Sequence, residues 1–136
     1  MRKTILITGA TDGIGLETAR MMILSGHNVL LHGRSLAKLE NVKSAFSAIA
    51  DGGQVESYVA DLSRLADVET LADVVAERYT KLDVLINNAG VYNTPDRLTR
   101  DGLDVRFAVN TIAPYLLTKR LLPLIGRSGR VINLSS

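Results

Sequence analysis

The sequence contains no cysteine and only two histidines, His27 and His32. The absence of cysteine excludes disulfide bonds, thiolate ligands for a metal ion and a cysteine nucleophile. Two histidines alone give little basis for a histidine-based metal centre, so we predict no metal site. The chemistry of this protein has to rest on other residue types.

A strong excess of charge and a long apolar run are missing as well. The 16 basic and 14 acidic side chains leave a net charge of only +2, and the pI of about 9.1 reflects this small imbalance. A chain without a basic stripe gives little support to nucleic-acid binding. Residues 1–3 are basic, but the apolar run behind them ends at Thr8 and Gly9, too early for a signal peptide or a membrane span. We therefore expect a cytoplasmic protein that binds neither nucleic acid nor a membrane.

What the sequence does contain is a globular composition in an alternating pattern. Hydrophobic residues make up 46% of the 136 residues and charged residues 22%, which suits one domain with a core. Short β-rich runs alternate with longer segments of helical period, as in a parallel α/β sheet. We predict strands at 4–8, 28–32, 55–59, 82–87 and 130–134 and helices at about 13–26, 35–49, 63–79 and 101–125. The sequence thus predicts one doubly wound parallel sheet over residues 1–136, with strand order 3-2-1-4-5.

The predicted helices carry apolar residues at three- and four-residue steps, which indicates one buried face on each. The second helix, with Ser35 as its expected N-cap, has Leu36, Leu39, Val42, Phe46 and Ile49 in this pattern, and the third has Val68, Leu71 and Val75. We expect the fourth helix to be interrupted by Pro114 and closed by Pro123 and Gly126.

A glycine-rich turn, TGATDGIG at positions 8–15, follows the first predicted strand and opens the first helix. Gly9 can take the tight turn, Gly13 lets a phosphate approach the backbone, and Gly15 lets the helix pack against the strand. Free N–H groups at the start of a helix attract a pyrophosphate. Such a turn can merely join a strand to a helix, but its place in the first strand–helix connection favours dinucleotide binding.

The spacing of this turn, G-x-x-x-G-x-G, resembles the fingerprint of the short-chain dehydrogenase/reductase family, T-G-x-x-x-G-x-G. Four further segments resemble motifs of that family in the same order: Asp61 in VADLS, Asn87-Asn88-Ala89-Gly90, Asn110 in VNT, and Leu134-Ser135-Ser136. The HGR, DGLDVRFAVNT and RVINLSS stretches are most similar to its retinol-dehydrogenase-like branch. The resemblance implies a Rossmann fold and a dinucleotide held by Gly9, Thr11, Asp12, Gly13, Ile14, Gly15, Arg34, Ser35, Asp61, Leu62, Asn88, Ala89 and Gly90.

The end of the second predicted strand bears on the choice of cofactor, because it reads HGRS and has no carboxylate. An acidic residue at this place usually bonds the ribose hydroxyls of NAD, whereas Arg34 can hold the 2′-phosphate of NADP and Ser35 can add a hydroxyl. Arg34 is also slightly unfavourable at a helix start unless an anion accompanies it. We therefore expect NADP(H) in preference to NAD(H). Asp12 favours the opposite choice, because many NADP-dependent relatives have a basic residue in the glycine turn.

By resemblance, the reaction is a reversible hydride transfer between the nicotinamide and a small-molecule alcohol or its carbonyl partner. The resemblance assigns the catalytic serine to Ser136 and the active-site asparagine to Asn110. It also implies that Asn88 and Gly90 lie at the nicotinamide end of the cleft. For Asn87, a role in tying neighbouring strands together is equally open.

Tyr115 and Lys119 have the Tyr-x-x-x-Lys spacing of the family's proton-transfer pair, but they precede Ser136 and share the helix of Asn110. At roughly 100° per residue, Tyr115 points about 140° around the helix from Asn110. We interpret Tyr115 and Lys119 as a surface or interface pair. The family's catalytic pair follows the serine, so the resemblance implies that a family member continues beyond this chain, which is expected to be inactive by itself. An uncovered fifth strand at the sheet edge predicts association, and relatives are commonly homo-oligomers.

Two alternatives to an oxidoreductase stay open. One is a catalytically inactive dinucleotide-binding module that acts as a sensor or a scaffold. The other is a nucleotide-sugar epimerase, which the glycine spacing favours less because those enzymes prefer G-x-x-G-x-x-G. The sequence does not predict the identity of the substrate.

Overall fold

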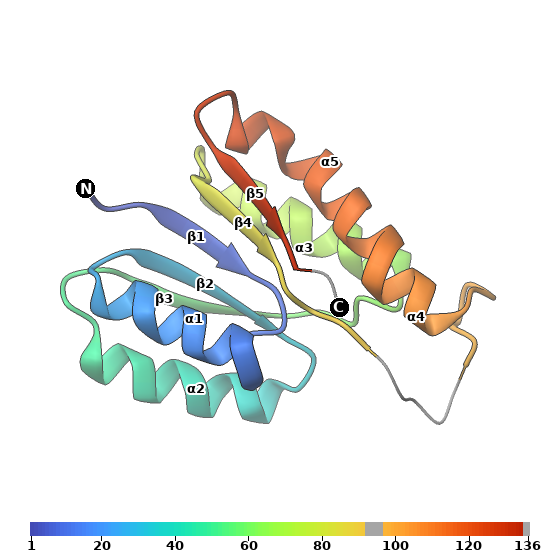
Figure 1. The fold of residues 1–136 in the computed structure, drawn as a ribbon, viewed down its shortest axis with the longest axis horizontal. Helices are drawn as coiled ribbons and strands as arrows, with labels where there is room; N and C mark the ends of the chain where they lie inside the picture. Colours follow the sequence, from blue (N-terminus) through green and yellow to red (C-terminus); the bar gives the residue numbers. More distant parts are fainter. Residues whose placement is uncertain (92–96, 135–136) are drawn as a thin grey trace.

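Five parallel strands form one sheet in the order β3-β2-β1-β4-β5, which confirms the predicted order (Figure 1). The computed structural model describes residues 1–91 and 97–134. The strands are β1 (Thr4–Ile7), β2 (Asn28–Gly33), β3 (Val55–Val59), β4 (Val84–Asn87) and β5 (Arg130–Asn133). Because neighbouring strands are parallel and in register, with Ile5 of β1 opposite both Val29 and Val84, the carboxyl ends of the strands meet at one edge of the sheet.

Helices cover both faces of the sheet (Figure 1). One face carries α1 (Gly13–Leu24) and α2 (Leu36–Ile49), and the other carries α3 (Leu65–Arg78) and α5 (Ala113–Ile125). Side chains alternate between the faces along each strand. Ile5 and Ile7 of β1 pack on the α1 and α2 side, whereas Leu6 packs on the α3 and α5 side. Burial on both faces explains why the three central strands, β1, β2 and β4, are nearly continuous apolar runs in the sequence.

The predicted buried faces of the helices are largely confirmed. Val68, Leu71 and Val75 of α3 are buried, as are Leu39 and Phe46 of α2, and Ser35 caps α2 by accepting a hydrogen bond from the N–H of Lys38. Leu36 and Ile49 were expected on the same face of α2 but are 59% and 40% exposed. They are the first and last residues of α2, at the two ends of its buried face. In the described part of the chain, no helix is both long enough and apolar enough to span a membrane.

The fourth predicted helix begins later than expected and changes its winding. Residues 98 and 104 pair in an antiparallel bridge, and Asp104 caps the short helix α4 (Val105–Phe107) by accepting hydrogen bonds from the N–H groups of Arg106 and Phe107. A π-helical turn, η1 (Ala108–Ile112), then leads into α5. The prediction of one helix from Asp101 is therefore wrong, because Asp104 supplies the N-cap and residues 98–104 form a hairpin.

Proline accounts for the π-helical turn. The N–H of Ala113 bonds the carbonyl of Ala108, five residues back, and Pro114 has no N–H to offer the carbonyl of Asn110. Pro114 thus lies in the first turn of α5, directly after the irregular turn. Pro123 lies inside the last turn of α5, and Gly126, with φ +63°, ends that helix.

The fifth strand lies at an edge of the sheet and is covered on one face only. Val131 packs against the core of the α3 and α5 side, whereas Ile132 is 43% exposed on the opposite face. An exposed edge strand with an apolar side chain is a template for pairing with another chain. Association of the chain through β5 stays a prediction.

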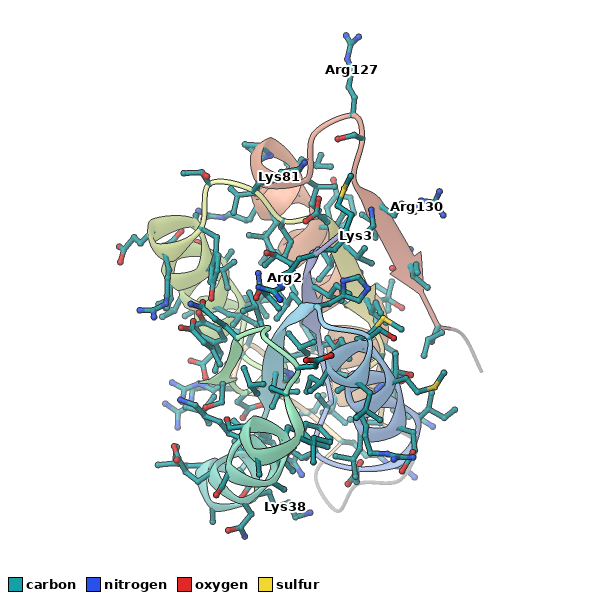
Figure 2. All side chains as sticks on the ribbon, turned by 90° about the vertical axis from the view of Figure 1, so that its left-hand side faces the viewer. Arg2, Lys3, Lys38, Lys81, Arg127 and Arg130 are labelled. Carbon is teal, nitrogen blue, oxygen red and sulfur yellow. The ribbon has the colours of Figure 1, made fainter. Side chains whose placement is uncertain are left out.

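Basic side chains gather at the edge where the strands begin (Figure 2). Those in front of or at the start of β1, β4 and β5 are Arg2, Lys3, Lys81, Arg127 and Arg130. Helices antiparallel to the strands end at this edge, so their carbonyl groups present partial negative charge there. Arg2 illustrates the arrangement, because its Nε donates to the carbonyl of Gly26, two residues after the end of α1 (2.8 Å). The basic edge therefore complements the carboxyl ends of the helices.

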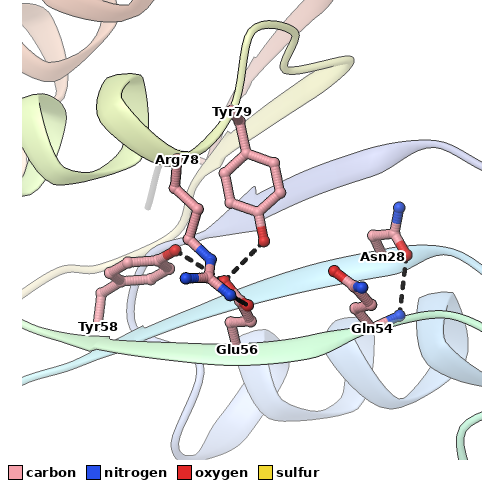
Figure 3. A network of polar contacts seen from close by, with 6 residues as sticks. All are labelled: Asn28, Gln54, Glu56, Tyr58, Arg78 and Tyr79. Atoms are coloured by element: carbon pink, nitrogen blue, oxygen red, sulfur yellow. Dashed lines mark hydrogen bonds and ion pairs between the residues drawn. The ribbon is translucent and has the colours of Figure 1, made fainter.

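One carboxylate joins the end of α3 to the edge strand β3 (Figure 3). Glu56 of β3 accepts hydrogen bonds from the hydroxyl of Tyr79 (2.7 Å) and the hydroxyl of Tyr58 (3.0 Å), and it pairs with the guanidinium of Arg78. Partial burial opposes ionisation of Glu56, but the hydrogen bonds from Tyr79, Arg78 and Tyr58 outweigh it and lower its pKa. Glu56 is thus ionised in the fold and holds three donors at once.

Replacing Glu56 with glutamine is expected to lower the free energy of unfolding by about 1–3 kcal/mol, because an amide oxygen cannot satisfy all three donors. Since the pKa of Glu56 is lower in the fold than in the unfolded chain, its contribution is present above the ordinary value of 4.5 and is lost as the pH falls through the lowered value. Urea denaturation at a series of pH values measures both effects. Glu77→Gln, an exposed change on α3 next to Arg78, is the control and should stay within about 0.5 kcal/mol. Equal stability of the two variants would contradict the role of Glu56.

Candidate functional site

A cleft of about 880 Å³ opens at the edge where the strands end. It is lined by the glycine turn after β1, by the ends of β2, β3 and β4, and by the hairpin that precedes α4. Ligands of open α/β sheets bind at this edge, outside the carboxyl ends of the strands. The cleft is therefore the candidate functional site.

The glycine turn forms one wall of the cleft. Gly9 and Gly13 have φ values of +64° and +56°, in the left-handed region that favours glycine. A Cβ on Gly13 would have no atom within 4 Å, so the turn is open above this residue. Asp12 is the N-cap of α1, yet its side chain accepts no hydrogen bond from the first turn, where the N–H groups have no partner within the helix. The wall thus offers free backbone donors and space, which is the arrangement that binds a phosphate.

Gly15 lies beneath this wall and has a different role. A Cβ on Gly15 would overlap the carbonyl oxygen of Gly9 and the side-chain amide of Asn88. The missing side chain therefore lets α1 pack directly against the turn, as the sequence predicted.

A second set of contacts joins the glycine turn to the segment after β4. The hydroxyl of Thr8 accepts hydrogen bonds from the N–H groups of Asn88 and Ala89, both 3.0 Å long. In return, the side-chain amide of Asn88 donates to the carbonyls of Thr8 (3.2 Å) and Gly9 (3.0 Å). Asn88 lines the cleft, but its amide is engaged with the glycine turn. It therefore fixes the two turns relative to each other.

His32, at the end of β2, makes a similar connection across three strands. It is 3% exposed, and its Nδ1 accepts a hydrogen bond from the N–H of Gly9 (3.0 Å). Its Nε2 lies 2.9 Å from the carbonyl oxygen of Ala60, which follows β3 and can only accept. The partners therefore define the neutral ring with its proton on Nε2. Burial lowers the pKa of His32, against the opposing effects of the Ala60 carbonyl and of Asp61.

The ends of β2 and β3 supply the polar groups at the far side of the cleft. Arg34 is exposed there, while Ser35 is not among the lining residues because its hydroxyl caps α2. Asp61 and Leu62 line the cleft after β3. One oxygen of Asp61 accepts from the hydroxyl (2.6 Å) and the N–H (3.0 Å) of Ser63, which holds this turn in place.

Asn110 lies at the other side of the cleft, in the π-helical turn. Its side-chain oxygen accepts from the N–H of Val91 (2.8 Å) and its amide nitrogen donates to the carbonyl of Val91 (2.9 Å). The segment after β4 is thus anchored to η1. Asn87 instead donates to the side chains of Asn133 (2.8 Å) and Thr118 (3.2 Å), so it ties β4 to β5 and α5, as one of its two sequence interpretations proposed.

Most of the predicted residues meet in the cleft. Its lining includes Gly9, Thr11, Asp12, Gly13, Ile14, Arg34, Asp61, Leu62, Asn88, Ala89, Gly90 and Asn110. Gly15 and Ser35 lie next to the lining, and Ser136 lies outside the described residues. Tyr115 is 67% exposed and Lys119 is exposed as well, which confirms that this pair belongs to the surface.

Two contributors were missed by the sequence interpretation. Thr8 was recognised as the first residue of the glycine motif and His32 as part of the HGR stretch, but neither was given a contact of its own. A polar residue at the end of an otherwise apolar strand was the available signal, because such a residue has to find a partner when it is buried.

Known proteins are similar to this chain in both sequence and fold. The family described as short chain dehydrogenase matches residues 3–136. Retinol dehydrogenase 12 of Mus musculus is 39% identical over 136 residues, covering 98% of this chain and 43% of the relative. Retinol dehydrogenase 13 of Homo sapiens is 36% identical over 136 residues, covering 98% of this chain and 41% of the relative. The chain thus spans about two fifths of the length of these curated relatives.

Among solved structures, a metagenomic short-chain oxidoreductase in complex with NADP has a TM-score of 0.85 and 34% sequence identity. The match covers 98% of this chain and 62% of that one. The similarity therefore extends over the whole sheet, the glycine turn and the cleft.

Proposed function

Because the chain belongs to the short-chain dehydrogenase family, we propose that it binds NADP(H) in the cleft as part of an oxidoreductase. The proposed reaction is hydride transfer between NADP(H) and an alcohol or its carbonyl partner. Bound NADP(H) would supply the hydride chemistry, and the chain would hold and orient the dinucleotide.

The observation that carries the proposal is the open phosphate cradle of the glycine turn beside Arg34. The free N–H groups at the start of α1 and the space above Gly13 fit a pyrophosphate. Arg34 lines the same cleft at the end of β2, where its guanidinium suits a 2′-phosphate. The solved relative named above is a complex with NADP, which supports the same choice of dinucleotide.

The opposite end of the cleft would receive the nicotinamide and the substrate. We propose that Gly90 and Asn110 line this end, with Asn110 held in a fixed orientation by its two hydrogen bonds to Val91. The family resemblance assigns the substrate-bonding hydroxyl to Ser136. A small alcohol is the proposed substrate class, and retinol is the first to try because two relatives are named retinol dehydrogenases.

Calorimetric titration of the purified protein with NADPH and NADH tests the proposal. We expect NADPH to bind roughly tenfold or more tightly than NADH, which is the effect of one charge-assisted contact to the 2′-phosphate.

Gly13→Ala should weaken the binding of both dinucleotides, because the new methyl group would occupy the space above the glycine turn that is proposed to hold the pyrophosphate. Gly126→Ala is the matched control, since Gly126 has a similar φ and equally open surroundings at the other edge of the sheet.

The outcomes separate an oxidoreductase from a catalytically inactive dinucleotide-binding module. Failure of both dinucleotides to bind would overturn the proposal. Binding of NADPH without any alcohol or carbonyl turnover in the protein that carries this chain would leave a dinucleotide-binding sensor or scaffold.

A further inference from the structure

We propose that His32 is a positioning residue that holds the glycine turn in its dinucleotide-binding conformation, and that protonation of its ring weakens dinucleotide binding. The inference rests on the proposed function and adds a pH dependence to the same site. It starts from a buried side chain for which the family motifs give no role.

The geometry makes His32 a link between the ends of three strands. The N–H of Ala10 donates to the backbone carbonyl of His32 (2.8 Å). The glycine turn is therefore held by both the backbone and the side chain of His32. The Nδ1 atom accepts a hydrogen bond from the N–H of Gly9. Gly9 has a positive φ and is the residue at which the chain turns away from β1. The Nε2 atom is fixed by the carbonyl of Ala60 on the far side. The ring therefore cannot turn toward Gly9 or away from it without breaking a bond.

Protonation removes the acceptor that this link needs. In the charged ring both nitrogens carry a proton, so Nδ1 would face the N–H of Gly9 as a second donor. The bond from Nε2 to Ala60 would survive, because it already uses a ring N–H. The two facing donors, Nδ1–H of His32 and the N–H of Gly9, would repel each other. The glycine turn that holds the pyrophosphate would therefore have to move away from β2.

The surrounding charges do not stabilise the charged ring enough to offset its burial. Asp61, after β3, attracts a proton on His32, but burial is the larger effect and the net pKa is lowered. Tyr58 is the register partner of His32 on β3. Glu56, also on β3, is engaged by Arg78 and two tyrosines. Asp12 of the glycine turn and Arg34 at the end of β2 lie on the adjoining segments and are exposed. The ring is therefore neutral near neutral pH and gains its proton only in acid.

ADP-ribose is the probe for the test, because its pyrophosphate stays ionised while the imidazole titrates. We expect its dissociation constant to be constant above about pH 6.5, the ordinary histidine value, and to rise at lower pH. Below the lowered pKa of His32 the dissociation constant should rise by up to about tenfold for each unit of pH, since the protein that binds ADP-ribose has to release the proton of His32. Tighter binding in acid would overturn the proposal, because it would mean that a charged ring attracts the pyrophosphate instead of displacing the turn.

Three variants separate positioning from a general effect of acid. His32→Asn keeps an acceptor near Nδ1 but cannot titrate, so it should bind more weakly than the unmutated protein yet show no rise in acid. His32→Leu removes both bonds and should bind more weakly at every pH. His27→Asn is the matched control, because His27 also accepts a backbone N–H (from Lys3, 3.0 Å) but lies at the opposite end of β2. An unchanged acid-dependent rise in His32→Asn would overturn the proposal.

The unmutated protein provides a second measurement that does not depend on the folding of any variant. In nuclear magnetic resonance spectra, the amide signal of Gly9 should shift with the same midpoint as the ring of His32. Saturating ADP-ribose should lower that midpoint, and an unchanged midpoint would overturn the proposal. Binding of NADPH near neutral pH tests the proposed function separately, so a flat pH profile with normal NADPH binding defeats only this inference.

Discussion

Replacing Gly15 with alanine is expected to lower the affinity for NADPH roughly a hundredfold and to cost about 1–3 kcal/mol of stability. The added methyl group would overlap the carbonyl of Gly9 and the amide of Asn88, neither of which can yield independently. Gly9 is bonded to His32, and Asn88 is bonded to the turn itself. The whole turn would have to shift, and the N–H groups at the start of α1 would lose their alignment with the pyrophosphate. Calorimetric titration and urea denaturation measure the two effects.

Gly53→Ala is the matched control for this change. A Cβ on Gly53 would overlap the carbonyl oxygen of His27, so this variant creates the same kind of clash with a backbone carbonyl as Gly15→Ala does. Gly53 lies just before β3, at the edge opposite the cleft. We expect a similar loss of stability without the loss of affinity. If Gly15→Ala bound NADPH as well as Gly53→Ala, the proposed place of the pyrophosphate would be wrong.

Replacing Arg34 with aspartate is expected to invert the cofactor preference, changing the ratio of NADPH to NADH affinity by roughly a hundredfold or more. Loss of a charge-assisted bond to the 2′-phosphate would cost about 1.5–3 kcal/mol for NADPH, and repulsion between two anions adds to it. A carboxylate at the end of β2 would meanwhile bond the ribose hydroxyls of NADH. Parallel titrations with both dinucleotides measure the ratio directly.

The control for Arg34 is a second arginine of the cleft. Arg100 lines the cleft from the hairpin before α4 and is exposed, so Arg100→Asp makes the same change of charge at another place. The charge at position 100 acts on the dinucleotide through solvent and is screened by salt. The ratio of NADPH to NADH affinity should therefore change by less than about threefold in Arg100→Asp. If both variants changed the ratio equally, the preference for NADPH would come from the overall electrostatic potential of the cleft. A direct contact between Arg34 and the 2′-phosphate would then be wrong.

The sequence was sufficient for the sheet order and for most of the cleft because both follow from local pattern. The central strands are apolar runs, the helices have a clear buried face, and the glycine turn has a fixed place after β1. The start of the fourth helix was predicted wrongly because Asp101 and Asp104 both look like N-caps in sequence. Only the hairpin formed by residues 98–104 selects Asp104.

The contacts within the site were harder to predict because they join residues distant in sequence. The hydrogen bond from Gly9 to His32 spans 23 residues, and the one from Asn88 to Thr8 spans 80. Such pairs depend on the register of neighbouring strands, which no local pattern reveals. Ser35 shows the reverse case, since its local role as a helix cap takes precedence over a place in the cleft lining.

The hydrogen bonds of Thr8, Asn88 and His32 have a kinetic consequence. They fix the glycine turn from two sides within the chain itself, so binding requires little loss of conformational entropy in this wall of the cleft. A dinucleotide meets donors that are already in place, and association need not wait for a loop to order. Differences in affinity between dinucleotides should therefore be expressed mainly in how long each stays bound.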